Sequence, residues 1–330
     1  MKHISILVPQ GDVALSCIDG PYTLFNKVNE FLQSMGKRPV FKVQLVGATS
    51  ATQVYSKTFT VCPDVTLSNI AQTDLIIIPA VNGDMKTVIE NNKNFNDWIN
   101  TQYASGAEVA SLCVGAFLLA STGLLDGKKC ATHWMAVNDF KLLFPQVNLV
   151  SEKIITDEQG IYSSGGANSF WNLLLYLVEK YTDREMAVLC AKYFEIEMDR
   201  TSQSPFMMFQ GQREHQDESV KQAQDFIEKN FQDKITVDKL SSMFAVGRRS
   251  LERRFKKATC NTVTTYIQRV KIEAAKKGFE TSRKNINEIM YDVGYSDIKA
   301  FRTIFKRNTG LSPIEYRNRY NKELMIFNQN

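Results

Sequence analysis

Hydrophobic residues in the first half of the chain gather in short, nearly continuous runs separated by segments with helical spacing. The runs are rich in β-branched residues and begin at Ile4, Lys42, Leu75, Glu108 and Ile161. Strands buried on both faces read in this way, so the alternation predicts an α/β sandwich, a parallel sheet with flavodoxin-like layers of helices on both faces. The intervening residues 20–36, 85–106 and 168–181 predict helices, and residues 53–67 predict an inserted hairpin.

The pattern changes beyond residue 219, where almost every segment has helical spacing. Thr236 is placed to cap a short helix, a turn follows at 245–247, and the basic segment from Arg248 places Leu251 and Phe255 four residues apart. The same arrangement recurs about 50 residues later. Its members are the Asn285 and Glu288 capping box, the turn at Gly294, the basic segment 297–310 with Phe301 and Phe305, and the capped helix that opens at Ser312.

Residues 263–280 join the two repeats and predict a single helix. Eighteen residues correspond to roughly 27 Å. Successive major grooves on one face of B-DNA lie about 34 Å apart, so such a rod can hold two recognition helices in adjacent grooves. The sequence therefore predicts an all-α domain with tandem helix-turn-helix units.

These patterns divide the chain into four parts: residues 1–200 form a ligand-sensing or dimerisation domain, 201–219 a linker, 220–320 a DNA-binding domain, and 321–330 a tail. Charge follows the same division. From Asp217 onward there are 23 Lys and Arg against 14 Asp and Glu, a net +9, and the preceding residues carry −4. A basic domain of this size points to a polyanion such as DNA, and a merely solvated basic face is the weaker alternative.

Composition excludes several other classes. The longest apolar runs are too short to span a bilayer, and the N-terminus lacks the pattern of a secretory signal. Six cysteines with no C-x-x-C pair, and only three histidines, give no zinc-ligand spacing. We expect free thiols in a cytoplasmic protein with no metal, no cofactor and no membrane partner.

The stretch ASLCVGAFLLAS, residues 110–121, joins a predicted strand to a predicted helix. A cysteine in such a turn projects above the sheet edge where ligands bind, and the helix N-terminus is expected to lower the pKa of its thiol. Gly115 lets the turn close. The pattern alone fits both a nucleophile and an ordinary small core residue.

Residues 110–134, ASLCVGAFLLASTGLLDGKKCATHW, resemble the elbow region of the PfpI/ThiJ superfamily, which shares its fold with class I glutamine amidotransferases. The C-x-G-A-F, G-L-L-D-G and A-T-x-H-W elements follow the order of GlxA-type regulators. The opening VPQGDVALSCIDGPYTLFNKVN is similar to the first strand, loop and helix of the same family. The resemblance covers about residues 3–200.

Enzymes of this superfamily pair the elbow cysteine with an acid in a D-x-x-G-P motif, and alignment on Gly20 and Pro21 places Cys17 at the acid position. The resemblance therefore implies a non-catalytic domain in which Cys113 is a vestigial nucleophile and His133 its candidate partner. It implies a ligand pocket lined by Cys17, Asp19, Cys113, Val114, His133, Ser164 and Gly165. A redox sensor that forms a Cys17–Cys113 disulfide is a lesser hypothesis.

Residues 220–320 resemble the AraC/XylS DNA-binding domain, through AVGRRSLERRFK in the first unit and I-x-E-I-M-x-D-V-G-Y-S-D with S-P-x-x-Y-R in the second. By family position, the residues that face base edges are Arg249, Glu252, Arg253, Lys299 and Arg302. Arg248, Arg254, Lys256 and Lys306 are expected to grip phosphate. Thr303 stands where an arginine is usual, and Gly247 where a serine precedes the first recognition helix.

These inferences converge on a sequence-specific DNA-binding transcription regulator whose degenerate PfpI-like domain responds to a small molecule. The expected partners are double-stranded DNA, an effector, a second copy in a homodimer, and RNA polymerase. Two alternatives remain open at this point: a cysteine-dependent hydrolase or hydratase with an accessory DNA-binding domain, and an architectural DNA binder without an effector.

Overall fold

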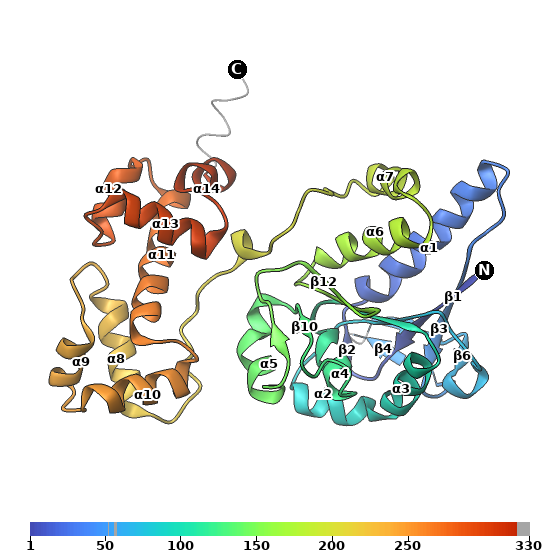
Figure 1. Cartoon of the computed structure of the whole chain (residues 1–330), viewed down its shortest axis with the longest axis horizontal. Coiled ribbons are helices and arrows are strands. Elements are labelled where there is room, and N and C mark those ends of the chain that lie inside the picture. Colours follow the sequence, from blue (N-terminus) through green and yellow to red (C-terminus); the bar gives the residue numbers. More distant parts are fainter. Residues whose placement is uncertain (52, 56–57, 322–330) are drawn as a thin grey trace, which may run out of the picture. The chain divides into compact units, whose positions relative to one another are not determined.

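The computed structural model describes residues 1–51, 53–55 and 58–321, and the chain divides into two compact units (Figure 1). The first unit is Met1–Gln203 and the second is Ser204–Asn330. The division falls inside the segment that the sequence predicts as a linker. The predicted tail beyond Asn321 lies outside the described residues.

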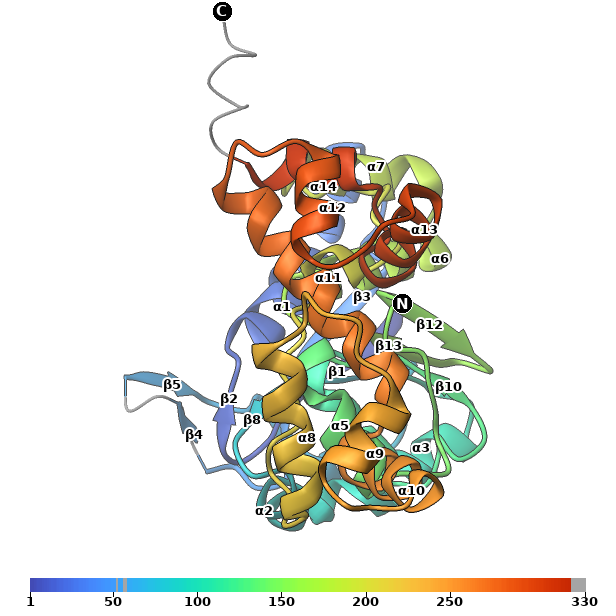
Figure 2. The ribbon, with the colours of Figure 1, turned by 90° about the vertical axis from the view of Figure 1, so that its left-hand side faces the viewer.

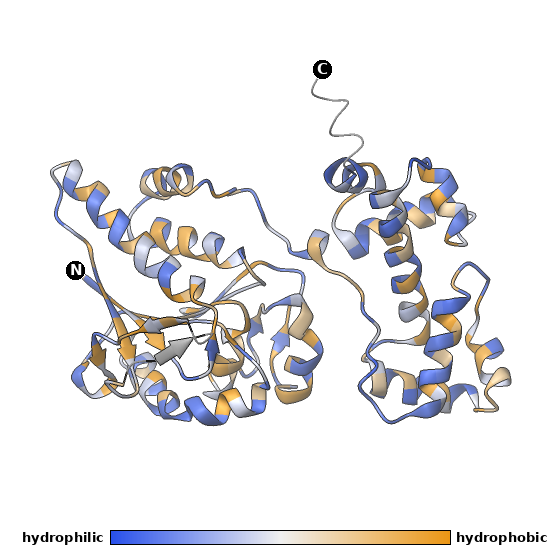
Figure 3. Ribbon diagram, turned by 180° about the vertical axis from the view of Figure 1, so that it is seen from behind, coloured by the Kyte–Doolittle hydropathy of each residue, from blue (hydrophilic) through white to orange (hydrophobic). Residues whose placement is uncertain are grey.

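A seven-stranded sheet forms the centre of the first unit, in the order β12-β13-β9-β7-β1-β3-β6. Its parallel strands are β1 (Lys2–Val8), β3 (Phe41–Gly47), β6 (Val65–Thr66), β7 (Leu75–Ile78), β9 (Glu108–Ser111) and β13 (Ile161–Ser164). β12 (Ile155–Glu158) pairs antiparallel with β13 at one edge. All five predicted strands are present. Every residue of β7 is buried, and the central strands are coloured hydrophobic in Figure 3.

Helices cover both faces of this sheet, as predicted. α1 (Ser16–Ser34), α6 (Ser169–Tyr181) and α7 (Arg184–Tyr193) lie on one face (Figure 1). α2 (Met85–Asn92), α3 (Asn96–Ala104) and α4 (Ala116–Ser121) lie on the other, and α5 (Val137–Leu143) lies near its end. The predicted helix 85–106 is broken after Asn92, whose backbone leaves the helical conformation before a 3-10 turn at Lys93–Phe95; its buried side chain bonds both backbone polar groups of Gln10.

Shorter pairs complete the first unit. β4 (Gln53–Tyr55) and β5 (Phe59–Val61) pair antiparallel, which confirms the predicted hairpin and is visible in Figure 2. Residues 56–57 between them lie outside the described part. Two further pairs are absent from the sequence prediction: β2 (Asp12–Val13) with β8 (Val81–Asn82), and β10 (Lys129–Cys130) with β11 (Asn148–Leu149).

The second unit is helical, as predicted. Its helices are α8 (Glu218–Lys229), α9 (Val237–Met243), α10 (Arg248–Thr259), α11 (Val263–Thr281), α12 (Ile286–Asp292), α13 (Ile298–Thr309) and α14 (Pro313–Tyr320). α11 runs between the other helices in Figure 2. The predicted caps at Thr236, Asn285 and Ser312 are all present, and Gly247 gives α10 no side-chain cap.

The internal repeat extends to the details of packing. Leu251, Phe255 and Thr259 are buried in one hydrophobic core or at its edge, and Phe301, Phe305 and Thr309 occupy the matching places 50 residues later. Thr259 and Thr309 both donate their hydroxyl to the carbonyl four residues earlier, at 2.8 and 2.9 Å. Each recognition helix therefore rests on its own small core, with both cores flanking α11.

Residues 204–213, here called the strap, pack along the helical unit rather than forming an open linker. The buried ammonium of Lys276 donates to the Met207 carbonyl at 2.7 Å. The Phe209 ring meets Tyr266 edge-on at 5.0 Å between centroids. Arg213 pairs with two carboxylates of α8. The strap thus belongs structurally to the second unit.

Candidate functional site

The first recognition helix, α10, turns its apolar residues inward and its basic residues outward. Arg249, Arg253 and Lys256 are exposed and have no ion-pair partner within residues 1–51, 53–55 and 58–321. Charged groups free of internal partners can bind an incoming phosphate or a base edge without first breaking an ion pair. These three residues stay predicted DNA contacts.

Three other predicted contacts on α10 are engaged within the protein. Arg248 Nη1 lies 3.0 Å from both carboxylate oxygens of Asp238 in α9, and its Nε is 3.5 Å from Glu252. Arg254 is bound by Asp217. Phosphate binding by Arg248 or Arg254 would have to compete with a carboxylate that is already in place.

The second recognition helix, α13, begins at an N-cap made by Asp297, whose carboxylate accepts the N–H groups of Lys299 and Ala300 at 2.7 and 3.1 Å. The predicted contacts Lys299, Arg302 and Lys306 are all exposed. Thr303 is exposed as well, and its hydroxyl donates to the Lys299 carbonyl. α13 therefore exposes fewer arginines than α10. Thr303 places a hydroxyl where AraC/XylS-type domains usually carry an arginine.

The elbow in the first unit has the geometry that its sequence predicts. β9 leads into a single 3-10 turn, Cys113–Gly115, and then into α4. Cys113 has φ 56°, a left-handed backbone that is uncommon outside glycine. A Cβ on Gly115 would lie 2.5 Å from the Ile78 carbonyl oxygen, so only glycine lets the turn approach β7 this closely.

The turn around Cys113 is held by neighbouring polar side chains. The Cys113 N–H donates to Ser164 Oγ at 3.0 Å, and the Thr132 hydroxyl donates to the Cys113 carbonyl at 3.1 Å. Both serine and threonine are buried. These bonds bring β9, β13 and the segment after β10 together at one edge of the sheet.

The Cys113 thiol differs from the sequence prediction in one respect. Burial raises its pKa above the ordinary value, although hydrogen bonds from the backbone of Ala167 and Val114 lower it. The pKa of the thiol therefore lies above its ordinary value and not below it as predicted, because desolvation of the thiolate outweighs the backbone N–H donors. The direction of this shift disfavours the thiolate.

His133 lies beside the elbow, and its side chain accepts a hydrogen bond from the backbone. Its ring packs directly over Gly166, where any Cβ would collide with it. Its Nδ1 accepts the Met135 N–H at 3.1 Å and so caps a short turn. Burial lowers the pKa of the His133 imidazole. Among the described residues no hydrogen bond joins His133 to Cys113.

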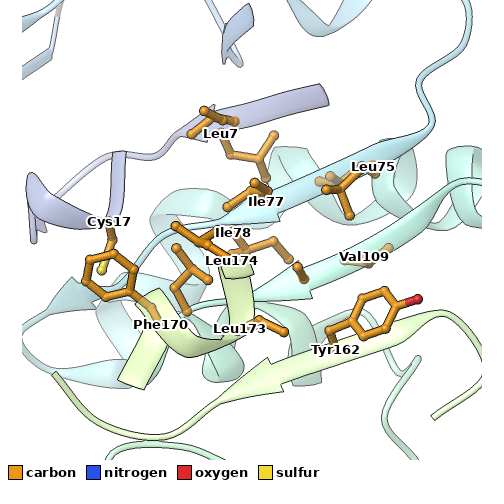
Figure 4. Close-up of a cluster of buried hydrophobic side chains, with 14 of the residues drawn as sticks. Leu7, Cys17, Leu75, Ile77, Ile78, Val109, Tyr162, Phe170, Leu173 and Leu174 are labelled. Atoms are coloured by element: carbon orange, nitrogen blue, oxygen red, sulfur yellow. The ribbon is translucent and has the colours of Figure 1, made fainter. Parts of the chain in front are cut away.

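Cys17 and Asp19 occupy opposite sides of α1. The Cys17 side chain is buried in the hydrophobic core that also contains Phe170 of α6 (Figure 4), and burial raises its pKa to about 12. The charge of an ionised Cys113 also raises it, so the two thiols are near neighbours. Asp19 is exposed and accepts a hydrogen bond from Thr23. The structure thus places a thiol, and not the nearby carboxylate, toward the elbow.

The remaining predicted pocket residues lie beside Gln203, a side chain that the sequence prediction missed. Ser164 and Gly165 are buried, and Val114 is half-buried. Gln203 is 1% exposed, accepts the Gly166 N–H at 3.0 Å and donates to the carbonyls of Thr132 and Ser151. It lies in the segment predicted as linker, and no sequence signal distinguishes a buried glutamine there from a solvated one.

No helix in the described part of the chain is long and apolar enough to cross a membrane.

Comparison with known proteins gives two family matches. Residues 28–180 match the DJ-1/PfpI family, and residues 240–319 match a family of helix-turn-helix domains. Each match falls within one structural unit.

Curated relatives and a solved structure resemble longer stretches of the chain. The HTH-type transcriptional regulator GbdR of Pseudomonas aeruginosa is 23% identical over 261 residues, which cover 78% of this chain and 69% of that protein. The HTH-type transcriptional regulator ArgR of the same organism is 27% identical over 215 residues, 65% of each chain. A ThiJ/PfpI family protein of Pseudomonas syringae is 15% identical, covers 81% of this chain and 90% of its own, and has a TM-score of 0.50, which shows likeness of fold alone.

Proposed function

We propose that this chain, which joins a DJ-1/PfpI-family domain to an AraC-type helix-turn-helix domain, is a sequence-specific transcription regulator. One observation carries the proposal: two recognition helices with matching cores stand on either side of a single linker helix. The 19 residues of α11 correspond to about 28 Å. This length suits adjacent major grooves on one face of a duplex.

The base-reading residues of the proposal are Arg249 and Arg253 on α10 and Lys299 and Arg302 on α13. All four are exposed. Arginine in the major groove donates to guanine O6 and N7 together, and each such contact discriminates by about 1 to 3 kcal/mol. Lys256 and Lys306 are proposed to bind phosphate.

The first unit is proposed to sense a small molecule without catalysing a reaction. Burial raises the pKa of the Cys113 thiol, and the Nδ1 of His133 accepts the Met135 N–H. Within the described residues no hydrogen bond joins His133 to Cys113, so the thiol lacks the paired base that activates a nucleophile. This speaks against the alternative of a cysteine hydrolase. A ligand at the elbow would regulate DNA binding only by favouring one conformation or assembly state over another. Homodimerisation, a cytoplasmic location and contact with RNA polymerase complete the proposal.

The test is selection of DNA from a random duplex pool by the full-length protein, followed by binding measurements over a range of salt concentrations. We expect an enriched motif of two half-sites whose centres lie about one helical turn apart, roughly 10 base pairs. We also expect affinity to fall steeply with salt, because bound phosphates release counterions. Retention of DNA without any enriched sequence would contradict specific recognition and would favour the architectural alternative.

A thermal-shift screen of metabolites tests the sensing role separately. A ligand that binds the folded first unit raises its unfolding temperature by mass action. We expect at least one small molecule to do so in the wild-type chain, and to do so less when Ser164 is replaced by a bulkier residue. A screen in which the same compounds shift both chains equally would place the ligand elsewhere.

A further inference from the structure

Lys271 is a buried lysine in the middle of α11, with 7% of its surface exposed. Lysines are rarely buried unless their ammonium is well supplied with partners. Here the partners are backbone carbonyls: Nζ lies 3.1 Å from the oxygen of Gly294 and 3.4 Å from that of Asp233. The ammonium also lies 5.4 Å from the centroid of the Tyr295 ring, in the range of a cation–π contact.

The two carbonyls belong to different helix-turn-helix units. Asp233 lies in the loop between α8 and α9, just before the first helix-turn-helix unit. Gly294 forms the turn of the second helix-turn-helix unit, between α12 and α13. A single ammonium on the linker helix therefore holds a loop of each unit. Burial lowers the pKa of Lys271, although the charge of Asp233 raises it.

The two loops also meet directly at this point. Gly294 has φ 73°, and a Cβ there would collide with the Gln232 carbonyl oxygen and lie 2.7 Å from Lys271 Nζ. Position 294 thus requires glycine for two reasons: its backbone is left-handed, and the carbonyl of Gln232 approaches it closely. Backbone groups of the two loops make this contact, and the neighbouring Phe231 packs against the hydrophobic core of the second helix-turn-helix unit.

The helices of the two helix-turn-helix units pack little against each other. Within the described chain, α8, α9 and α10 pack against one another or against α11, and no extensive packing joins them to α12, α13 or α14. A groove of about 350 Å³ lies between the units, lined by Asp238 and Arg248 on one side and by Tyr295 and Ile304 on the other. Lys271 lies in its wall. Besides Lys271, the two helix-turn-helix units are joined by Phe231 and by the strap. Arg213 of the strap pairs with α8, and residues 204–206 of the strap pack against α13.

We propose that Lys271 is a positioning residue for DNA recognition: it fixes the angle and distance between α10 and α13, and so sets the spacing of the half-sites that the protein accepts. The inference rests on the proposed function as a DNA-binding regulator. Two binding modules held at a fixed separation gain affinity only for targets that match it. Lys271 itself touches no DNA in this proposal.

The experiment uses the full-length chain and the motif selected by the wild type, in duplexes whose half-site spacing is changed by one or two base pairs. Lys271→Met removes the ammonium and keeps the length of the side chain. Lys277→Met, an exposed lysine of the same helix, is the matched control. We expect the wild type and the control to lose about tenfold or more in affinity when the spacing changes.

For Lys271→Met we expect a flatter profile, with affinity for the original spacing lowered about tenfold and the altered spacings bound nearly as well. The preferred bases within each half-site should stay the same. A spacing profile equal to that of the wild type would overturn the proposal. If the wild type selects no motif at all, the proposed function fails instead, and the two failures are distinct.

A second variant keeps the test decisive if Lys271→Met does not fold. Lys271→Gln retains a neutral donor that reaches one carbonyl but cannot bind both. Circular dichroism and thermal unfolding establish which variants are folded. The affinity of a folded Lys271→Gln protein should depend on half-site spacing less than that of the wild type, but more than the flat profile expected for Lys271→Met. A profile equal to that of the wild type would again overturn the proposal.

Discussion

Arg254 of α10 forms a two-pronged ion pair with Asp217, the residue that caps the N-terminus of α8. Its Nε and Nη2 lie 2.7 and 2.5 Å from the carboxylate oxygens, and Asp217 Oδ1 also accepts the Val220 N–H. The hydrogen bond from Arg254 lowers the pKa of Asp217 below its usual range. The preceding residue, Arg253, is exposed. Adjacent arginines therefore have different surroundings and are expected to have different roles.

Replacement of Arg253 by alanine is expected to weaken binding to the selected DNA motif by about 1 to 3 kcal/mol and to relax preference at one base position. Arg254→Ala should leave that base preference unchanged and lower the unfolding temperature of the helical unit. Binding to single-base variants of the motif, with thermal unfolding measured in parallel, distinguishes them. Loss of base preference in Arg254→Ala, with Arg253→Ala unaffected, would reverse the assignment.

Cys113 is expected to react slowly with iodoacetamide at neutral pH, because burial raises the pKa of its thiol. The reaction rate should rise as pH increases past the pKa of an ordinary cysteine. Mass spectrometry of the alkylated peptide measures the rate, and the exposed Cys62 and Cys260 of the same chain are internal standards. Faster labelling of Cys113 than of these two at pH 7 would show an activated thiolate and revive the enzyme hypothesis.

Glu108 is expected to make the first unit sensitive to acid. Burial by itself would raise the pKa of this carboxyl, but hydrogen bonds from Tyr181, Tyr162 and Lys180 outweigh it and lower the pKa. The folded state thus binds a proton on Glu108 less readily than the unfolded chain. Glu108 makes its whole contribution to stability above its pKa in the unfolded chain, about 4.3. The contribution is lost as pH falls through the lower pKa of the folded state.

The variant Glu108→Gln should therefore be less stable than the wild type at pH 7, by about 1 to 3 kcal/mol. The difference should shrink as pH falls below about 4, because protonation removes the same interactions from the wild type. Urea unfolding of the full chain followed at several pH values tests this. A difference that stays constant with pH would mean that Glu108 contributes through packing rather than charge.

The strap is expected to stabilise the helical unit. Phe209→Ala removes a ring that contacts Tyr266 and lies under the guanidinium of Arg269, and should cost about 1 to 3 kcal/mol. The neighbouring Met208 is 52% exposed, so Met208→Ala is a matched control with little expected effect. Chemical unfolding of both variants measures the difference. Equal stability of the two would mean that residues 204–213 behave as a linker.

Local patterns predicted the elements of this protein well. The caps at Thr236, Asn285 and Ser312 and the inward residues of α10 and α13 depend on positions three or four apart in the chain, which sequence displays directly. The strap and Gln203 were missed for the opposite reason. Their partners, such as Lys276 and Thr132, lie about 70 residues away, and polar composition alone resembles a linker.

The sequence by itself determined the two-domain plan, the parallel sheet, the elbow at Cys113 and the tandem units, because each follows from short-range periodicity or from a local motif. Only the tertiary structure decided which charges are free and which are bound. Arg253 and Arg254 look alike in sequence, as do Lys271 and Lys277, yet one of each pair is exposed and the other is held by a distant partner. Burial and pairing depend on elements far apart in the chain, so they decide the state of the Cys113 thiol and the link between the recognition helices.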